Sequence, residues 1–103
     1  MKNLLKIEEY EELLTKPKVL LVFSAGWCGH CITFKPTLAS FEKQHGKDIE
    51  TVIIDIDDFE NLADKYDIMS IPSLVLLENG IVAKQNVGGL SENVLAKFAG
   101  LVK

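Results

Sequence analysis

The chain has 103 residues, of which 48% are hydrophobic and 25% charged, and its formal net charge is −4. This length fits one globular domain, residues 1–103. The acidic balance argues against nucleic acid and anionic membranes as partners, and no apolar run approaches the ~18 residues that a membrane span needs. Because residues 1–9 lack the apolar segment of a secretion signal, we expect a cytoplasmic protein, and we expect it to be a monomer.

The first part of the chain predicts a strand, a helix and a second strand. Residues 3–6 are predicted to form a short edge strand. The helix that follows places its apolar side chains on one face, namely Ile7, Tyr10, Leu13 and Leu14. Residues 16–18, Lys-Pro-Lys, end this helix. Residues 19–23 are all apolar, and the lack of alternation predicts a central strand buried on both faces, as in a parallel sheet.

A longer helix is predicted after this strand. It begins near Cys28, is clear over residues 32–45, contains Pro36 and ends at Gly46. Its inward side chains are expected to be Ile32, Leu38 and Phe41. The β-branched run 51–56 then forms another strand, which the right-handed crossover rule makes parallel to the central one.

Two further helices are predicted, one before and one after the last two strands. Asp57 or Asp58 is expected to cap a helix that continues to about Tyr66. Ser91 is expected to cap the final helix. The buried face of that helix is predicted to carry Val94, Leu95 and Phe98.

The last two strands, residues 74–77 and 81–87, flank the dipeptide Asn79-Gly80. This dipeptide is a strong signal for a tight hairpin, so these strands are predicted to be antiparallel, with Lys84 on an exposed edge. Together the elements predict an α/β fold. Its central mixed sheet is built from a βαβ unit and a C-terminal ββα unit, with helices on both faces.

Cys28 and Cys31 are the two cysteines of the chain, and they lie three residues apart where a strand is predicted to give way to a helix. One helical turn of about 5.4 Å separates such positions, within the roughly 4.4 to 6.8 Å between Cα atoms that a disulfide requires. Two cysteines in a reducing compartment are more typical of a redox or metal site than of a structural disulfide. The spacing therefore predicts a dithiol that opens and closes reversibly.

The nucleophilic form of cysteine is the thiolate, and a thiol of ordinary pKa near 8.5 is only about 3% ionised at pH 7. At a helix start, Cys28 would gain roughly 0.3 to 1 kcal/mol for the thiolate from the helix dipole. An imidazolium of His30 between the two sulfurs would add to this. Cys28 is thus predicted to attack a disulfide, and the deeper Cys31 to resolve the resulting mixed disulfide, with no cofactor bound to the chain.

The chain resembles the thioredoxin family over nearly its whole length, through residues 23–31, Pro36, Ile71-Pro72 and Val87-Gly88. The resemblance implies the thioredoxin fold and a thiol–disulfide oxidoreductase that acts on disulfide-containing proteins. It also implies that electrons come from NADPH through a separate thioredoxin reductase. A cis bond between Ile71 and Pro72 would face the cysteines. Trp27 and Gly88 would complete a shallow groove for an extended peptide.

Two features depart from the usual thioredoxin pattern. The interior of the motif, Gly29-His30, resembles that of protein disulfide isomerase domains, whereas thioredoxins usually carry Gly-Pro. Groups that stabilise the reduced form make a disulfide a stronger oxidant, so these two residues are predicted to tune the site to a more oxidising potential. In addition, the buried Asp and Lys of thioredoxins align with Val22 and Ile53. The usual proton acceptor for the buried cysteine is therefore absent.

The same residues allow other interpretations. A zinc site needs about four ligands, and only His30 and His45 could join the cysteines, so no metal is expected. Aspartates 55, 57 and 58 are more typical of a helix cap and solvated surface than of a metal site. The alternative that stays open is a binding module or complex subunit with weak redox turnover, because Val22 and Ile53 replace the family's charged pair.

Overall fold

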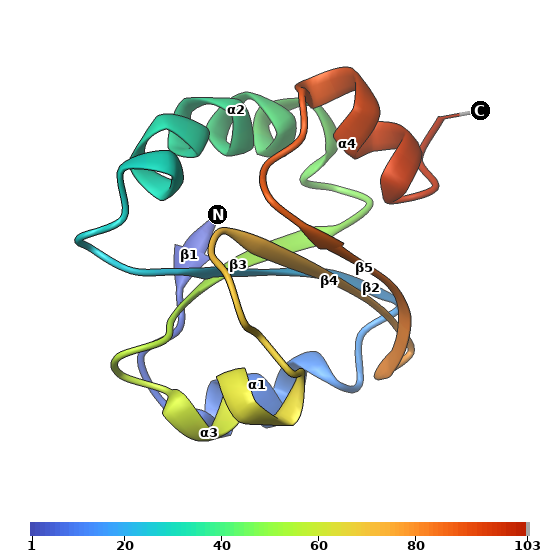
Figure 1. Cartoon of the computed structure of the whole chain (residues 1–103). Coiled ribbons are helices and arrows are strands. Elements are labelled where there is room, and N and C mark those ends of the chain that lie inside the picture. Colours follow the sequence, from blue (N-terminus) through green and yellow to red (C-terminus); the bar gives the residue numbers. More distant parts are fainter. Residues whose placement is uncertain (103) are drawn as a thin grey trace.

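The computed structural model describes residues 1–102, which contain a five-stranded mixed sheet with helices on both faces (Figure 1). The strands are β1 (Lys2–Asn3), β2 (Lys18–Ser24), β3 (Glu50–Asp55), β4 (Ser73–Glu78) and β5 (Ile81–Val87). The helices are α1 (Ile7–Leu13), α2 (Gly29–His45), α3 (Glu60–Lys65) and α4 (Glu92–Phe98). The strands follow the order β1-β3-β2-β4-β5. This architecture confirms the predicted fold class.

The central strand β2 is parallel to β3 and antiparallel to β4. Its pairing with β3 places Ser24 opposite Asp55 at the carboxyl ends of both strands. The predicted βαβ unit is therefore present, with α2 as its crossover helix. β4 and β5 form the predicted antiparallel hairpin. Its turn residues Asn79 and Gly80 have φ of 53° and 80°, a left-handed conformation that these two residue types adopt most easily.

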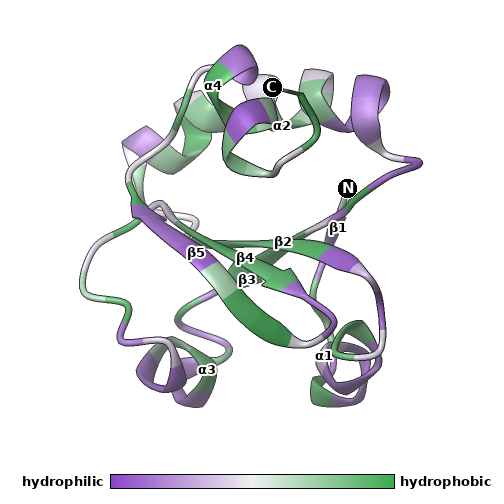
Figure 2. Ribbon diagram, turned by 90° about the vertical axis from the view of Figure 1, so that its right-hand side faces the viewer, coloured by the Kyte–Doolittle hydropathy of each residue, from purple (hydrophilic) through white to green (hydrophobic). Residues whose placement is uncertain are grey.

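Side chains of β2 alternate between two cores, one on each face of the sheet. Leu21 and Phe23 pack with α1 and α3, whereas Leu20 and Val22 pack with α2 and α4. Figure 2 shows the apolar strands lying between the two helical layers. Each fully buried Leu or Phe side chain contributes roughly 1.5 to 3 kcal/mol of hydrophobic stabilisation. The central strand is therefore held firmly from both faces.

β1 is shorter than the predicted strand 3–6, because the chain turns toward α1 after Leu4. The N–H groups of Leu5 and Lys6 donate to the carboxylate of Glu9, at 2.8 and 3.0 Å. These donors are satisfied at the start of the helix instead of in the sheet. The same bonds lower the pKa of Glu9, the bond from Leu5 being the main cause.

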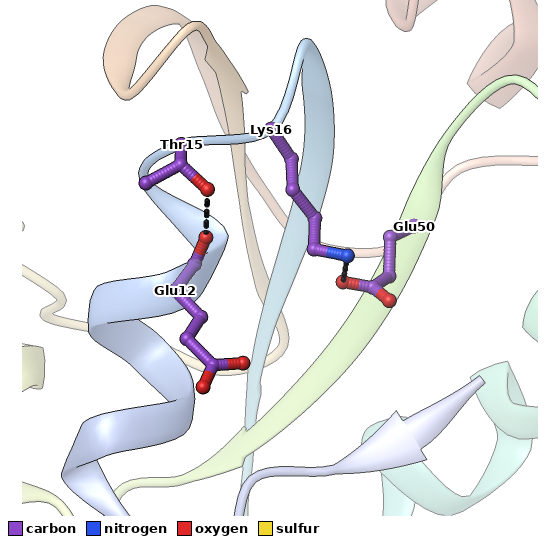
Figure 3. A network of polar contacts seen from close by, with 4 residues as sticks. All are labelled: Glu12, Thr15, Lys16 and Glu50. Atoms are coloured by element: carbon purple, nitrogen blue, oxygen red, sulfur yellow. Dashed lines mark hydrogen bonds and ion pairs between the residues drawn. The ribbon is translucent and has the colours of Figure 1, made fainter.

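Polar contacts fix the chain between α1 and β2 (Figure 3). The Thr15 hydroxyl donates to the carbonyl of Glu12 at 2.7 Å, which satisfies a carbonyl in the last turn of α1. Lys16 then reaches across to β3, where its Nζ lies 3.8 Å from Oε2 of Glu50. An ion pair this exposed is worth at most about 1 kcal/mol. It aligns the turn with the sheet more than it stabilises the fold.

Three side chains predicted to point inward are instead exposed. Ile7, Ile32 and Val94 are 45%, 54% and 47% exposed. In each helix the buried stripe follows residues three or four apart, and a neighbour one position along is turned by about 100°. The buried stripe of α2 consists of Cys31, Phe34, Leu38 and Phe41. Hydrophobic character alone therefore misassigned Ile32, which directly follows a buried residue.

The acidic segment after β3 forms a turn, and the prediction that Asp57 or Asp58 caps α3 is wrong. The N–H of Asp57 donates to the carboxylate of Asp55 at 2.8 Å. The N–H groups of Asp58 and Phe59 donate to the Asp55 carbonyl at 3.2 and 3.0 Å. α3 therefore begins only after Phe59, which offers no side-chain cap.

α4 is fixed at both ends. Ser91 caps it as predicted, since its Oγ accepts the N–H of Val94 at 3.4 Å. At the other end, the ammonium of Lys18 donates to the carbonyl of Ala99 and lies 3.5 Å from Oε2 of Glu78. The first residue of the central strand thus contacts the end of the final helix.

Candidate active site

Cys28 lies at the junction between β2 and α2, where it is the N-cap residue of the helix. Its sulfur accepts a hydrogen bond from the backbone N–H of Cys31 at 3.2 Å and lies 3.8 Å from the carbonyl oxygen of Ile71. The start of a helix carries a partial positive charge, and unpaired N–H groups there stabilise an anion. The position is therefore suited to a thiolate.

Cys31 lies one turn further into α2 and is 3% exposed, against 7% for Cys28. Both are free thiols. Burial raises the pKa of the Cys31 thiol, and its hydrogen bond with Cys28 acts in the same direction. Hydrogen bonds with the Ser24 side chain and the Ala25 backbone lower this pKa without cancelling the rise. Cys31 therefore stays protonated near neutral pH.

A groove of about 550 Å³ lies beside α2 and brings together four of the predicted site residues. It is lined by His30, Thr33, Phe34, Thr37, Ile71, Pro72, Gly88, Gly89, Leu90 and Ser91. The bond between Ile71 and Pro72 is cis, as the resemblance implies, and the N–H of Gly88 donates to the Pro72 carbonyl at 2.7 Å. Gly88 has a φ of 94° and leaves open space where a side chain would begin.

Trp27 stands outside the lining of this groove and is 69% exposed. Its indole N–H donates to the carboxylate of Asp57 at 2.9 Å. This bond joins the loop before α2 to the turn after β3. It therefore restrains the exposed indole ring of the residue that directly precedes Cys28.

Comparison with known proteins settles the family. The family model described as Thioredoxin matches residues 2–100. The chain is 40% identical to thioredoxin of Bacillus subtilis over 70 residues, which cover 68% of this chain and 67% of that one. It is 32% identical to thioredoxin of Mycoplasmoides gallisepticum over 99 residues, or 95% and 98% of the two chains. The chain belongs to the thioredoxin family.

Membership in the thioredoxin family makes the protein a thiol–disulfide oxidoreductase with a CxxC pair, here Cys28 and Cys31. The same fold is seen in the X-ray structure of Fasciola hepatica thioredoxin, which is 24% identical to this chain. The two structures match with a TM-score of 0.86 over 100% of both chains. The resemblance noted in the sequence is thus confirmed at the level of family, fold and activity.

Gly29 and His30 occupy the interior of the thioredoxin motif, and both are exposed at the start of α2. His30 lines the groove. Within residues 1–102, the polar partners of the Cys28 sulfur are the N–H and thiol of Cys31 and the Ile71 carbonyl, and His30 is not among them. An effect of His30 on that sulfur would therefore act through space, and its role in tuning the redox potential stays a prediction.

Val22 and Ile53 occupy the positions where thioredoxins carry their buried Asp and Lys. They are 2% and 9% exposed and lie directly opposite each other on β2 and β3. Both belong to the core that packs against α2. Neither side chain can accept a proton, so any acceptor for the Cys31 proton must come from another position.

Sequence reasoning missed two polar residues that contact the motif. Asp57 was predicted as a helix cap, and nothing in the sequence indicates that a residue 30 positions after Trp27 bonds to its indole. Ser24, whose side chain lowers the pKa of the Cys31 thiol, was not considered. Its signal was present in the sequence, because a serine directly follows the apolar run 19–23 and precedes the motif.

Over residues 1–102, no three His, Cys, Asp or Glu side chains gather into a group that could hold a metal ion. In the same range, no helix is both long enough and apolar enough to cross a bilayer.

Proposed function

We propose that the protein exchanges disulfides in other proteins with Cys28 as the attacking thiol and Cys31 as the resolving thiol. The observation that carries this order is the 3.2 Å hydrogen bond from the Cys31 N–H to the Cys28 sulfur at the start of α2. This bond and the helix terminus stabilise negative charge on Cys28, whereas burial keeps Cys31 protonated. The two thiols therefore act in a fixed sequence.

In the first step, the Cys28 thiolate attacks one sulfur of a substrate disulfide, and the other sulfur leaves as a thiolate with the bonding electron pair. In the second step, Cys31 loses its proton and attacks the Cys28 sulfur of the mixed disulfide. The Cys28–Cys31 bond forms, the bond to the substrate breaks, and the second substrate sulfur leaves as a thiolate. Two electrons have then passed to the substrate, and the reverse sequence oxidises a dithiol.

The groove beside the cysteines supports an extended peptide segment as the substrate. Ile71, Pro72 and Gly88 line it, and the open space at Gly88 lets another chain approach closely. Two exposed apolar side chains lie next to site residues in the sequence. Trp27 precedes Cys28 and is 69% exposed, and Val87 precedes Gly88 and is 75% exposed. Such a surface binds through backbone contacts and general apolar contacts. The groove is therefore suited to segments of many different disulfide-containing proteins and is not specific for a single one.

Electrons for reduction would come from NADPH through a separate thioredoxin reductase, in a reducing cytoplasm. The Gly29-His30 interior of the protein disulfide isomerase type would give a more oxidising potential than Gly-Pro. For this two-electron couple, about 30 mV corresponds to 1.4 kcal/mol. A protonated His30 on the first turn of α2 would favour a thiolate at Cys28, and with it the reduced form.

Insulin reduction tests this function. With dithiothreitol as the electron source, the native chain should accelerate insulin precipitation, and a Cys28→Ser variant should not. Replacing dithiothreitol with NADPH and a thioredoxin reductase tests the proposed electron source separately. In addition, Cys31→Ser should accumulate mixed disulfides with substrate, whereas Cys28→Ser should not, since only the attacking thiol forms them.

A second candidate function is a binding module with weak turnover, favoured by the apolar pair Val22 and Ile53. This candidate predicts that the native chain binds peptides in the groove but does not accelerate insulin reduction with either electron source. Activity in the dithiothreitol assay that depends on Cys28 would exclude it.

A further inference from the structure

β2 and β3 place a polar pair two residues beyond the apolar pair Val22 and Ile53. Ser24 lies opposite Asp55 in the same parallel register. Side chains two residues apart on a strand point to the same face, so Ser24 and Asp55 face α2, as Val22 and Ile53 do. The polar pair is also nearer to the carboxyl ends of the strands, where Cys31 lies on the first turns of α2.

Ser24 connects the buried thiol to this polar pair. It is 7% exposed, and it directly precedes Ala25, which packs with Cys28 and Cys31 in one buried cluster. In keeping with this proximity, interaction with the Ser24 side chain lowers the pKa of the Cys31 thiol. Ser24 and Asp55 both line a cavity of about 340 Å³, together with Lys35 of α2 and Asp58. A cavity of this size has room for several water molecules, and its polar lining residues supply the two to four partners that each water needs.

We propose that Ser24 and Asp55 form the proton exit for Cys31, an inference that rests on the resolving role proposed above. During resolution the Cys31 sulfur gives its proton to Oγ of Ser24 while it forms the bond to the Cys28 sulfur. Ser24 releases its own proton through the cavity to the carboxylate of Asp55. The electron pair of the broken disulfide leaves on the substrate sulfur, and Asp55 returns its proton to solvent.

The chemistry requires both members of this pair. Burial makes the Cys31 thiol hard to ionise, so resolution needs a group that takes the proton as the sulfur attacks. A hydroxyl is too weak a base to keep that proton, and it serves as a shuttle. The carboxylate of Asp55 is the stronger base. It is held toward the end of β3 by the N–H of Asp57, which donates to its Oδ1 at 2.8 Å.

A stopped-flow reaction with dithiobis-nitrobenzoate separates the two steps. The reduced protein releases one coloured nitrobenzoate thiolate when Cys28 attacks, and a second one when Cys31 resolves the mixed disulfide. The ratio of the second rate to the first is the readout. Ser24→Ala and Asp55→Asn should each lower this ratio about tenfold, because each removes one part of the proton exit.

Three variants make the test specific. Ser24→Thr keeps the hydroxyl and should restore the ratio to near the native value. Asp55→Asn retains an oxygen acceptor for the Asp57 N–H, so the turn is preserved while the base is lost. Thr51 is on β3, as Asp55 is, and its buried hydroxyl has no hydrogen-bond partner within residues 1–102. Thr51→Val should therefore leave both rates unchanged.

Combining Ser24→Ala with Asp55→Asn should slow resolution no further than either change alone, since both act on one path. A native rate ratio in both single variants, or an equal slowing of the two phases, would overturn the proposed proton exit. A native chain that releases no second thiolate would instead refute the resolving role of Cys31. The two failures are therefore distinguishable.

Discussion

Val22 on β2 lies directly opposite Ile53 on β3, and the two side chains share the core that packs against α2. Val22 is 2% exposed, so burying a charge there would remove it from most of its contact with solvent. Substitutions at these two positions therefore test how much stability a buried acid would cost the protein.

Val22→Asp should destabilise the protein increasingly from acid to neutral pH. Burial would raise the pKa of the new carboxyl above its unfolded value near 3.9. Below about pH 3.9 both states are protonated and the ionisation penalty is absent. As the pH rises, the unfolded state loses its proton first. The free energy of unfolding then falls, by about 1.4 kcal/mol per unit of pKa difference between the two states. Denaturant midpoints between pH 3 and pH 8 would measure this trend.

Val22→Asn serves as the control for Val22→Asp, because it buries a polar group that does not ionise. It should lower stability by a nearly constant amount across the same pH range. Adding Ile53→Lys to Val22→Asp should recover part of the loss at neutral pH, since the new charges would lie opposite each other. A pH-independent loss in Val22→Asp would contradict the burial of position 22.

The reduced protein should lose stability as the pH rises above about 8.5, because of Cys31. Its folded pKa is raised, chiefly by burial, so the folded state holds the thiol proton more tightly than the unfolded state does. The stabilising contribution is complete below the unfolded pKa near 8.5 and is lost as the pH rises toward the folded pKa. Denaturant midpoints in excess reductant between pH 7 and pH 9.5 would show this decline, and Cys31→Ala should flatten it.

Measurements for this test should stay below pH 10. The pKa of Tyr66 is also raised by burial and by its hydrogen bond with Tyr10, whose hydroxyl lies 2.5 Å away. Ionisation of that tyrosine in the unfolded state begins near pH 10 and would add its own destabilisation. An identical decline in the native chain and Cys31→Ala below pH 10 would mean that another group is responsible.

His30→Pro should make the redox potential more reducing. The change removes the imidazole on the first turn of α2, so a thiolate in the reduced form loses a group that would stabilise it when protonated. Proline is tolerated there because N–H groups in the first helical turn have no partner within the helix. Equilibration with glutathione buffers would measure the potential, and an unchanged or more oxidising value would exclude His30 as the tuning residue.

Gly88→Ala should destabilise the protein by about 1 to 2 kcal/mol although there is space for the methyl group. The φ of 94° is unfavourable for any residue with a Cβ. Gly26→Ala is the matched control, because no atom lies within 4 Å of the new Cβ and its φ is not in the left-handed region. Thermal unfolding would compare the two, and equal midpoints would show that the backbone at Gly88 readily adjusts.

Most of the fold followed from local patterns in the sequence. The unbroken apolar run 19–23 predicted the central strand, and Asn79-Gly80 predicted the hairpin, since strand burial and turn conformation depend on neighbouring residues. Helix faces were predicted less well. Ile32 was assigned inward, but the packing of Cys31 and Phe34 against the sheet sets the rotation of α2, and that depends on tertiary contacts.

The candidate site divides in a similar way. Cys28 and Cys31 are apparent from spacing alone, and the groove residues Ile71 and Pro72 came from the family resemblance. By contrast, the bond between Trp27 and Asp57 joins residues 30 positions apart, and it arises from the parallel register of β2 and β3. Such a contact follows from strand register, which single residues in a sequence do not reveal.

The position of Lys18 has a consequence for how the molecule opens. Its ammonium donates to the carbonyl of Ala99, the residue that follows α4, and pairs with Glu78, the last residue of β4. Separation of α4 from the sheet must break this bond and bring the fully buried Leu95 into water. The final helix and the end of β4 should therefore open together as one cooperative unit. Their amide protons would then exchange with solvent at a common opening free energy, despite their separation along the chain.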